Sequence, residues 1–258
     1  MTRLTAIFAA FLLAGCASGP PLDTTYTSLN QDSRAQYLVI HFTSESFESA
    51  LKTLTTGGRV SSHYLVRDDP PTIYRLVDEN RRAWHAGVSS WKGQTQLNAA
   101  SIGIEITNRG LRGPPGEEVY QPYPPAQMEA VMALIRDIIK RHEIRPDRVV
   151  GHSDIAPQRR SDPGPMFPWK RLADEGLIPW PNATTVAARL PTFEQNLPDI
   201  EWFQQRLARH GFAVPRNGEL DEETVRVISV FQMKYRPARF DGAPDAETAA
   251  ILDALVNP

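Results

Sequence analysis

The chain reads YLVIHFT at residues 37–43, a nearly continuous apolar run of strand length. Such a run is typical of a strand buried on both faces of an α/β sheet. Further strand-like segments follow at 63–66, 73–77, 102–106 and 148–151. Helical spacing of apolar residues lies between strands at 47–54, and again in an amphipathic helix that begins at Pro125. This alternation predicts an α/β domain over residues 37–181, with a mixed central sheet flanked by helices.

The N-terminal residues resemble a bacterial lipoprotein signal. Arg3 precedes an apolar run over residues 4–14, which is too short to span a bilayer but suits the hydrophobic region of a secretory signal. The run ends in Leu-Ala-Gly-Cys16, which resembles a lipobox. The resemblance implies a signal peptide over 1–16, a lipid-modified Cys16 and a polar tether over 17–36. The alanine after the cysteine favours the outer membrane, facing the periplasm. The alternative is a buried amphipathic segment with an incidental cysteine.

Composition limits the class of protein. The 258 residues are 41% hydrophobic and 22% charged, which suits one medium globular domain and one small one. The 28 lysines and arginines nearly balance the 30 aspartates and glutamates, so bulk charge predicts no attraction to nucleic acid. The single cysteine excludes an intramolecular disulfide and a cysteine-rich zinc site.

The C-terminal part is predicted to be a small all-α domain of three helices, over residues 197–258. Prolines cluster near residues 182–196, which we interpret as a linker. Beyond it, apolar residues at helical spacing predict helices over 199–210, 222–235 and 246–256. Asp221 and Asp245 precede the second and third helices, where aspartate favours the N-cap position.

Three separated polar residues offer the ligands of a catalytic zinc ion. His41 ends a predicted strand, His152 follows another, and Asp162 lies in a proline-rich loop. Catalytic zinc takes three nitrogen or oxygen ligands from the protein and keeps one position open for water. Spacing alone leaves the question open, because distant histidines and a loop aspartate are more often unrelated than metal-binding.

A longer pattern contains two of these residues. The stretch GHSDIAPQRRSDPG at 151–164 closely resembles the signature of zinc-dependent N-acetylmuramoyl-L-alanine amidases of the second amidase family, which includes AmpD-like and AmiD-like enzymes. Three shorter pieces agree in order: VIH at 39–41, WHAG at 84–87 and SIGIE at 101–105. The resemblance covers roughly residues 37–181. It implies hydrolysis of the amide bond between the lactyl group of N-acetylmuramic acid and L-alanine of the peptidoglycan stem peptide.

The same resemblance assigns the central chemistry residue by residue. It makes His41, His152 and Asp162 the ligands of Zn²⁺. Glu105 becomes the general base that takes a proton from water and passes it to the leaving nitrogen. The alternative for Glu105 is a surface glutamate on an edge strand.

Residues around this centre match the family less firmly. Arg160 stands where relatives often carry lysine, the cation thought to stabilise the oxyanion, and Arg159 is a possible substitute. Trp84 and His85 match a segment that lines the substrate groove, and His63 begins a strand near the same site. We therefore expect these three to bind substrate, with a structural role as the alternative for both histidines.

The C-terminal segment resembles the three-helix peptidoglycan-binding domain of wall hydrolases. The matching residues are Phe203, Gln204, Leu207, Gly211, Phe212, Gly218, Leu220, Asp221, Thr224, Phe231, Gln232, Asp241, Gly242, Asp245 and Thr248. The resemblance implies peptidoglycan or muropeptides as partners. Similar units also occur as packing modules only.

The sequence thus predicts a zinc amidase of cell-wall turnover or remodelling, anchored to a membrane by lipid and monomeric. A recognition protein that binds peptidoglycan without cutting it is the alternative from another class. Relatives that lost catalysis usually lack a zinc ligand, whereas all three candidate ligands and Glu105 are present here. A cytosolic recycling amidase acting on anhydro-muropeptides is a third reading, and the lipobox argues against that compartment.

Overall fold

The structure is a computed structural model that describes residues 19–56 and 58–257. The predicted signal peptide and Cys16 lie outside the described residues, so the lipid anchor stays a prediction. The chain divides into two units, Met1–Asp32 and Ser33–Pro258. In the first unit, residues 19–32 are exposed and contain no helix or strand. No helix among the described residues is long and apolar enough to cross a membrane.

The second unit is built on a five-stranded sheet in the order β3-β2-β6-β1-β9. The strands are β1 (Tyr37–Phe42), β2 (Tyr64–Val66), β3 (Ile73–Arg75), β6 (Ser101–Ile106) and β9 (Val149–Gly151). All neighbours pair in parallel except β2 and β3, which confirms the predicted mixed sheet. Ligands of such sheets bind beyond the carboxyl ends of the parallel strands. The register places His41 opposite Glu105 and Ile40 opposite Gly151, so the predicted site residues meet at that edge.

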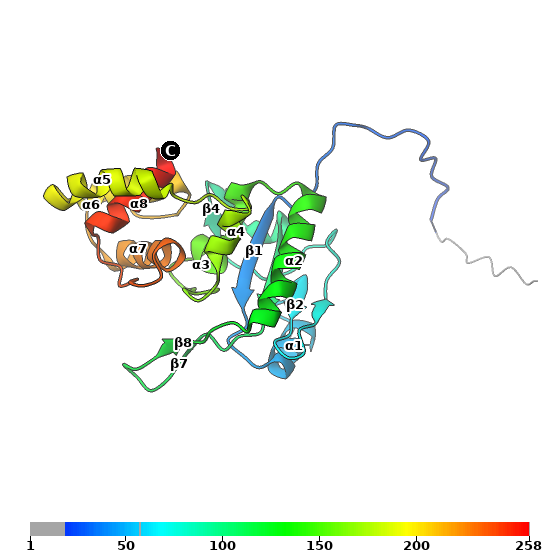
Figure 1. Ribbon diagram of the computed structural model, residues 1–258. Helices are drawn as coiled ribbons and strands as arrows, with labels where there is room; N and C mark the ends of the chain where they lie inside the picture. The colour runs from blue at the N-terminus through cyan, green and yellow to red at the C-terminus, as the bar shows by residue number, and fades with distance from the viewer. Residues whose placement is uncertain (1–18, 57, 258) are drawn as a thin grey trace, which may run out of the picture. The chain divides into compact units, whose positions relative to one another are not determined.

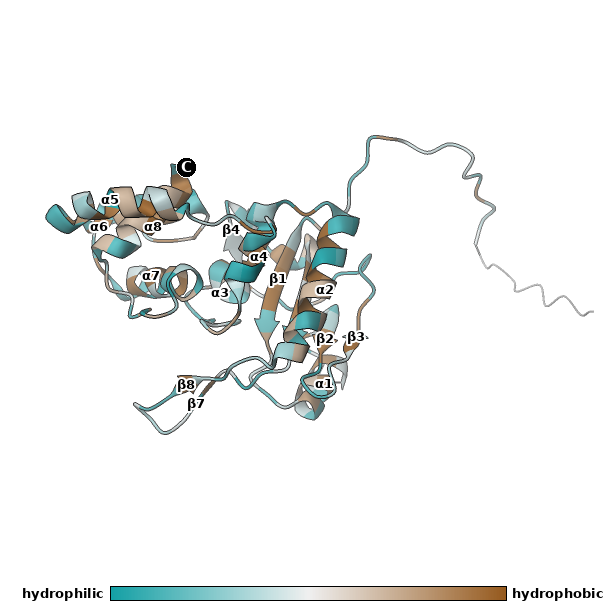
Figure 2. Ribbon diagram, viewed as in Figure 1, coloured by the Kyte–Doolittle hydropathy of each residue, from teal (hydrophilic) through white to brown (hydrophobic). Residues whose placement is uncertain are grey.

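Helices cover the sheet on both faces. The part of the unit that contains the sheet has the helices α1 (Phe47–Thr56), α2 (Pro125–His142), α3 (His152–Ile155) and α4 (Trp169–Asp174). Short elements complete it: β4 (Ser90–Trp91), β5 (Gln94–Thr95), η1 (Leu97–Ala99), β7 (Leu111–Arg112), β8 (Val119–Tyr120) and η2 (Pro146–Arg148). Figure 1 shows α2 running beside β1, and in Figure 2 the ribbon of β1 is mostly brown, or apolar, while that of α2 alternates between brown and teal.

The alternation of side chains along β1 divides the core into two clusters. Leu38 and Ile40 belong to the cluster that contains the apolar side chains of α2. Tyr37 and Val39, on the opposite face, belong to a cluster with the C-terminal helices. Burying one such aliphatic side chain stabilises the fold by about 1.5–3 kcal/mol. The sheet therefore depends on a helical layer at each face.

The C-terminal region contains four helices, one more than the sequence predicts. They are α5 (Ala183–Gln195), α6 (Ile200–His210), α7 (Glu222–Tyr235) and α8 (Ala246–Val256). The predictions for α6, α7 and α8 are confirmed, and Asp221 and Asp245 cap α7 and α8 as expected. The segment interpreted as a linker, 182–196, is helical: α5 fills it and packs against α8. Asn182 caps α5, and the helix continues through Pro191.

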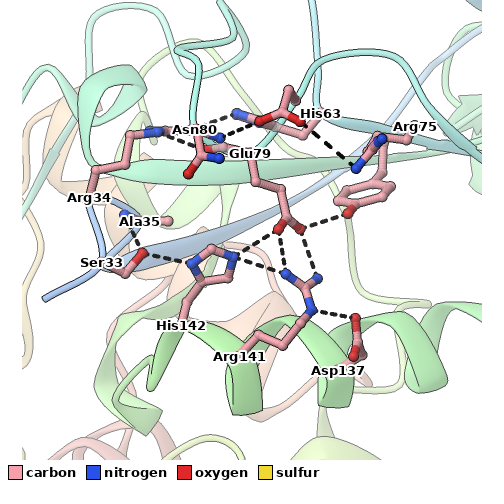
Figure 3. Close-up of polar contacts among 12 residues, drawn as sticks. Ser33, Arg34, Ala35, His63, Arg75, Glu79, Asn80, Asp137, Arg141 and His142 are labelled. Carbon is pink, nitrogen blue, oxygen red and sulfur yellow. Dashed lines mark hydrogen bonds and ion pairs between the residues drawn. The ribbon is translucent and has the colours of Figure 1, made fainter. Parts of the chain in front are cut away.

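The compact unit begins at Ser33, before the predicted domain start at residue 37. Ser33 Oγ lies 2.6 Å from His142 Nδ1, and His142 Nε2 lies 2.9 Å from a carboxylate oxygen of Glu79 (Figure 3). Arg141 and Tyr64 also donate hydrogen bonds to this carboxylate. Burial alone would raise the pKa of Glu79, but these hydrogen bonds outweigh it and lower the pKa to about 2. The network joins the start of the unit to the end of α2.

Replacing Glu79 with glutamine should make the protein less stable at neutral pH. The folded protein holds the Glu79 pKa below its unfolded value, so this group stabilises the fold above about pH 4.5 and loses that contribution as the pH falls toward 2. Hydrogen bonds to charged groups contribute about 1.5–3 kcal/mol each where they are buried. Thermal melts from pH 7 to pH 3 should show a gap in melting temperature that narrows as the pH falls.

The matched control is Glu48→Gln, because Glu48 is exposed and its ion pair with Arg67 is long, at 4.0 Å. Its melting temperature should follow that of the unmodified protein at every pH. A gap for Glu79→Gln that stays constant with pH would contradict the assignment to the charged carboxylate.

Candidate active site

Three acceptor atoms converge at the carboxyl edge of the sheet. His41 is the next-to-last residue of β1, His152 begins α3 directly after β9, and Asp162 lies on the loop that follows α3. His41 Nδ1 lies 2.9 Å from His152 Nδ1 and 3.1 Å from Asp162 Oδ2, and His152 Nδ1 lies 3.2 Å from the same oxygen. All three residues are at least 95% buried. Ser153 N donates to the Asp162 carbonyl at 2.8 Å, which fixes the loop against the start of α3.

A chain of hydrogen bonds behind His41 decides which of its nitrogens carries the proton. Ser101 Oγ donates to the carbonyl of Leu97, so it must accept from His85 Nε2, 3.1 Å away. His85 Nδ1 is then unprotonated and accepts from His41 Nε2 at 3.0 Å. The lone pair of His41 Nδ1 is left to face His152 and Asp162. This arrangement is the outer support that metal-binding histidines commonly have.

His152 has the same tautomer for a simpler reason. Its Nε2 lies 3.2 Å from the carbonyl oxygen of Ala86, which can only accept, and farther, at 3.5 Å, from Arg159 Nη2, which itself donates to Ala86; the closer contact places the proton on Nε2 and leaves Nδ1 without one. The Ala86 segment is itself held, because Asn98 Oδ1 accepts from the backbone N–H groups of His85 and Ala86. Both Nδ1 lone pairs and one carboxylate oxygen therefore point at a common space.

The electrostatics of this space favour a cation. Burial, followed by the neighbouring His152, lowers the pKa of His41 to about 4, which leaves its ring neutral at pH 7. Burial by itself would raise the pKa of Asp162, but the two histidines beside it hold this pKa well below the usual range, so the group is a carboxylate at pH 7. Three acceptors with no donor between them repel one another unless a cation joins them. Tetrahedral zinc with bonds of about 2.0–2.1 Å separates its ligand atoms by about 3.3 Å, close to the observed spacings.

Glu105 stands beside this trio. One of its carboxylate oxygens lies 3.9 Å from His41 Nδ1, and the other, Oε2, is buried without a hydrogen-bond partner among the described residues. Burial, and then the charge of Asp162, raises the pKa of Glu105 well above its usual range. The alternative of an edge-strand glutamate is wrong, because β6 lies between β2 and β1. A buried carboxylate at this distance is placed to exchange a proton with a water bound in the same space.

A cleft opens over these residues. It is lined by Trp84, His85, Glu105, His152, Arg160 and Asp162 together with residues of β1, α1 and the loops that follow them. The site thus has a buried set of ligands, an adjacent carboxylate and access from solvent.

The comparisons with known proteins agree with this geometry. A model of the N-acetylmuramoyl-L-alanine amidase family matches residues 31–165, and a model of a peptidoglycan binding domain matches residues 196–252. The amidase model covers more than half of the chain. This protein belongs to the N-acetylmuramoyl-L-alanine amidase family.

Similar proteins extend the match over nearly the whole amidase. The N-acetylmuramoyl-L-alanine amidase AmiD of Escherichia coli K12 is 44% identical over 97% of this chain and 96% of its own length. A solved complex of AmiD from E. coli superposes with a TM-score of 0.80, at 43% identity over 91% of this chain and 93% of the other. AmpDh3 from Pseudomonas aeruginosa has a TM-score of 0.83, at 37% identity over 92% of this chain and 97% of the other. The predicted family and fold are confirmed.

The two arginines of the signature have different surroundings in the amidase. Arg159 donates to the carbonyl of Ala86 and, at 2.7 Å, to the carbonyl of Val88. Arg160 lines the cleft with Glu105; its backbone N–H donates to the carbonyl of Ala156, but its guanidinium makes no hydrogen bond to any residue the structure describes. The guanidinium of Arg159 is therefore held by backbone carbonyls, whereas that of Arg160 is available to contact a substrate in the cleft.

Of the three predicted substrate-binding residues, one is exposed at the cleft and two are buried. Trp84 is 51% exposed at the cleft, with the guanidinium of Arg82 4.0 Å from its ring centroid. His85 is buried and bridges His41 to Ser101, which favours its structural alternative. His63 is fully buried, with one ring nitrogen accepting from Gly103 N and the other beside Arg34, so it lies away from the cleft. The expectation that His63 contacts substrate is not supported by this placement.

Two supporting residues escaped the sequence analysis. Ser101 holds the ring of His85, and Asn98 holds the backbone at Ala86. Ser101 is the first residue of the matched piece SIGIE, so the sequence offered a signal for it. A polar residue at the start of an otherwise apolar strand needs a partner, and this was the available signal.

Enlarging Gly103 should disturb the metal site without touching a ligand. A Cβ atom at this position would lie 2.5 Å from the ring of His85, and the ring is fixed between His41 and Ser101. We expect Gly103→Ala to destabilise the amidase by about 1–3 kcal/mol and to weaken metal binding roughly tenfold or more. Thermal melts and metal titration measure the two effects.

The matched control is Gly93→Ala, where the added Cβ meets nothing within 4 Å but the positive φ strains the backbone. This variant should lose some stability and keep its metal affinity. Equal metal affinity in the two variants would contradict the role given to His85.

Proposed function

We propose that the protein is a zinc-dependent amidase that hydrolyses the bond between the lactyl group of N-acetylmuramic acid and the L-alanine of the stem peptide. The observation that carries this proposal is the convergence of two Nδ1 lone pairs and one carboxylate oxygen with no donor between them. His41, His152 and Asp162 would hold the zinc ion. When bound, zinc lowers the pKa of a water ligand and polarises the carbonyl of the scissile amide.

The residues around the ligands supply the other parts of the reaction. Glu105 takes a proton from the attacking water and delivers it to the leaving nitrogen of L-alanine. Its buried Oε2 has no partner in the described part of the chain, so the carboxylate is available for this transfer. Arg160 faces the developing oxyanion from the cleft wall. His85 and Ser101 keep His41 in the tautomer that leaves Nδ1 unprotonated.

Substrate preference follows the relatives. The solved AmiD complex contains the substrate anhydro-N-acetylmuramic acid-L-Ala-D-gamma-Glu-L-Lys, and the AmpDh3 complex contains an anhydromuramic pentapeptide. We propose that this protein accepts muropeptides and peptidoglycan with the same bond. The match of residues 196–252 to a peptidoglycan binding domain supports binding of the wall. The lipobox-like sequence at Cys16, with alanine after the cysteine, supports anchoring at the outer membrane, facing the periplasm; we propose that the anchored enzyme is a monomer.

A digest of purified sacculi tests the function. The protein from residue 17 onward is incubated with sacculi, with and without a zinc chelator, and the released products are identified by mass spectrometry. Peptides with a free L-alanine N-terminus should appear, vanish with chelator and return with added zinc. Binding of sacculi without such peptides, even with zinc restored, would favour the recognition protein. Light scattering after gel filtration checks the monomer.

The role of Arg160 is tested by Arg160→Met, which keeps the length of the side chain without its charge. We expect kcat to fall by about 10²–10³, as for loss of one oxyanion donor, with unchanged zinc content and melting temperature. Arg159→Met should instead lower the melting temperature, because the carbonyl of Val88 loses its donor and that of Ala86 keeps only the one from His152 Nε2. A large loss of kcat in Arg159→Met but not in Arg160→Met would show that Arg159 stabilises the oxyanion.

A further inference from the structure

The loop that carries the metal ligands contains a buried ion pair with the C-terminal module, which we define as α5 to α8. Asp154 follows the ligand His152 by two residues, and its side chain is 2% exposed. Its Oδ2 accepts from Gly151 N at 2.8 Å and from Lys234 Nζ at 2.7 Å. Lys234 belongs to α7, and its side chain is 6% exposed. One ion pair therefore joins α7 to the segment that presents His152.

The surroundings of Lys234 hold its ammonium group in place. The Nζ atom lies 4.2 Å from the ring centroid of Trp169 and 5.8 Å from that of Tyr235. The indole of Trp169 also covers the backbone at Gly151, where a Cβ atom would come within 3.3 Å of the ring. Lys234, Trp169 and Gly151 thus form one packed group at the start of α3.

The same helix touches the outer part of the loop. Gln158 Nε2 donates to the carbonyl of Glu223 at 3.0 Å, and Arg226 Nη1 donates to the carbonyl of Gln158 at 2.8 Å. Ile155 and Ala156 share a core cluster with the apolar side chains of α7. The loop between His152 and Asp162 is therefore attached to α7 at its start, its middle and its outer turn.

Loss of the lysine charge would be costly for this segment. A carboxylate that is 98% buried and loses its cation is strongly destabilised, so the loop must move or admit water to relieve it. Any such movement reaches the ligands directly, since Asp154 accepts from Gly151 N and Ser153 N donates to the Asp162 carbonyl.

We propose that Lys234 is a positioning residue for the metal centre, so that the C-terminal module contributes to metal retention as well as to any binding of the wall. The inference rests on the proposed function, because it takes His41, His152 and Asp162 as zinc ligands. It gives α7 a role in positioning the metal ligands, which the match of this region to a peptidoglycan binding domain does not imply.

The test compares two buried cations of the module in the full chain. Lys234→Met removes the ion pair to the loop, and Arg236→Met removes the 2.7 Å pair between Arg236 and Asp245, which lies inside the module. Zinc affinity is measured by competition with a chromophoric chelator, and the visible absorption of the cobalt-substituted proteins reports the geometry of the ligands. Melting temperature is recorded for both.

We expect Lys234→Met to bind zinc about ten- to a hundredfold more weakly and to show an altered cobalt spectrum. Arg236→Met should lose melting temperature while keeping the zinc affinity and the cobalt spectrum of the unmodified protein. The double variant Lys234→Met/Asp154→Asn, which has no unpaired carboxylate, should recover part of the zinc affinity. Should Lys234→Met fail to fold, Lys234→Gln keeps a donor without the charge and is measured instead.

Unchanged zinc affinity and cobalt spectrum in the Lys234 variant would overturn the proposal, and so would equal losses in both single variants. Failure of the unmodified protein to bind zinc would instead reject the proposed metal centre itself, so the two failures are distinguishable.

Discussion

Asp162→Asn is expected to lose zinc and, with it, all measurable amidase activity. The substitution keeps the volume of the side chain but removes the negative charge that both histidine Nδ1 atoms face at 3.1 and 3.2 Å. The ligand set would then be three neutral groups, one of which can present an amide N–H to the ion. Loss of supporting contacts alone weakens metal binding 10–100-fold, so loss of a charged ligand should exceed about a hundredfold.

Zinc content after dialysis and activity on a soluble muropeptide measure this effect together. Asp174→Asn is the control, because Asp174 is exposed and its ion pair is with Lys170, one turn earlier in α4. That variant should retain both zinc and activity. Stoichiometric zinc in Asp162→Asn after dialysis would show that Asp162 is not a ligand.

Glu105→Gln should separate catalysis from metal binding. We expect kcat to fall by about 10²–10⁴, the usual contribution of a general acid or base, while zinc remains bound. The same change should leave the melting temperature equal or higher, because it removes a buried carboxylate whose Oε2 has no partner within the described ranges. Lost activity with retained or increased stability is the pattern of a group kept for chemistry.

The control for this variant is Glu45→Gln, another carboxylate at the cleft, which accepts hydrogen bonds from Ser49 and Thr53. It should retain most activity. A Glu105→Gln protein with more than about a tenth of the original kcat would be incompatible with general base catalysis by this residue.

The sequence predicts the central sheet and the position of the site because both depend on local patterns. The apolar run around Val39 and Ile40 indicates a buried strand, and a residue at the end of such a strand, here His41, faces the ligand edge. The matched signature then supplies His152 and Asp162, which spacing alone had left undecided. Their convergence needs the parallel pairing of β1 with β6 and β9, which only the structure provides.

Other features could not be predicted because their signals are distant or conflicting. Pro191 argued against a helix, and the packing of α5 on α8 overrides that local preference. His63 was expected to bind substrate because it begins a strand near the site, and its actual partners, Arg34 and Gly103, lie far away in the sequence. No motif connects Lys234 to Asp154, which become neighbours only when α7 packs on the loop.

Because the side chains on the two faces of β1 belong to different core clusters, the domains of such enzymes cannot be exchanged freely. Tyr37 and Val39 lie in a cluster that continues through Ile155 and Ala156 to the apolar side chains of α7, so a cut at the apparent domain boundary would divide this shared core. A wall-binding domain grafted from another hydrolase would have to reproduce that covering surface as well as its own affinity. Inheritance and engineering of this chain should therefore treat the catalytic and wall-binding parts as one exchangeable block.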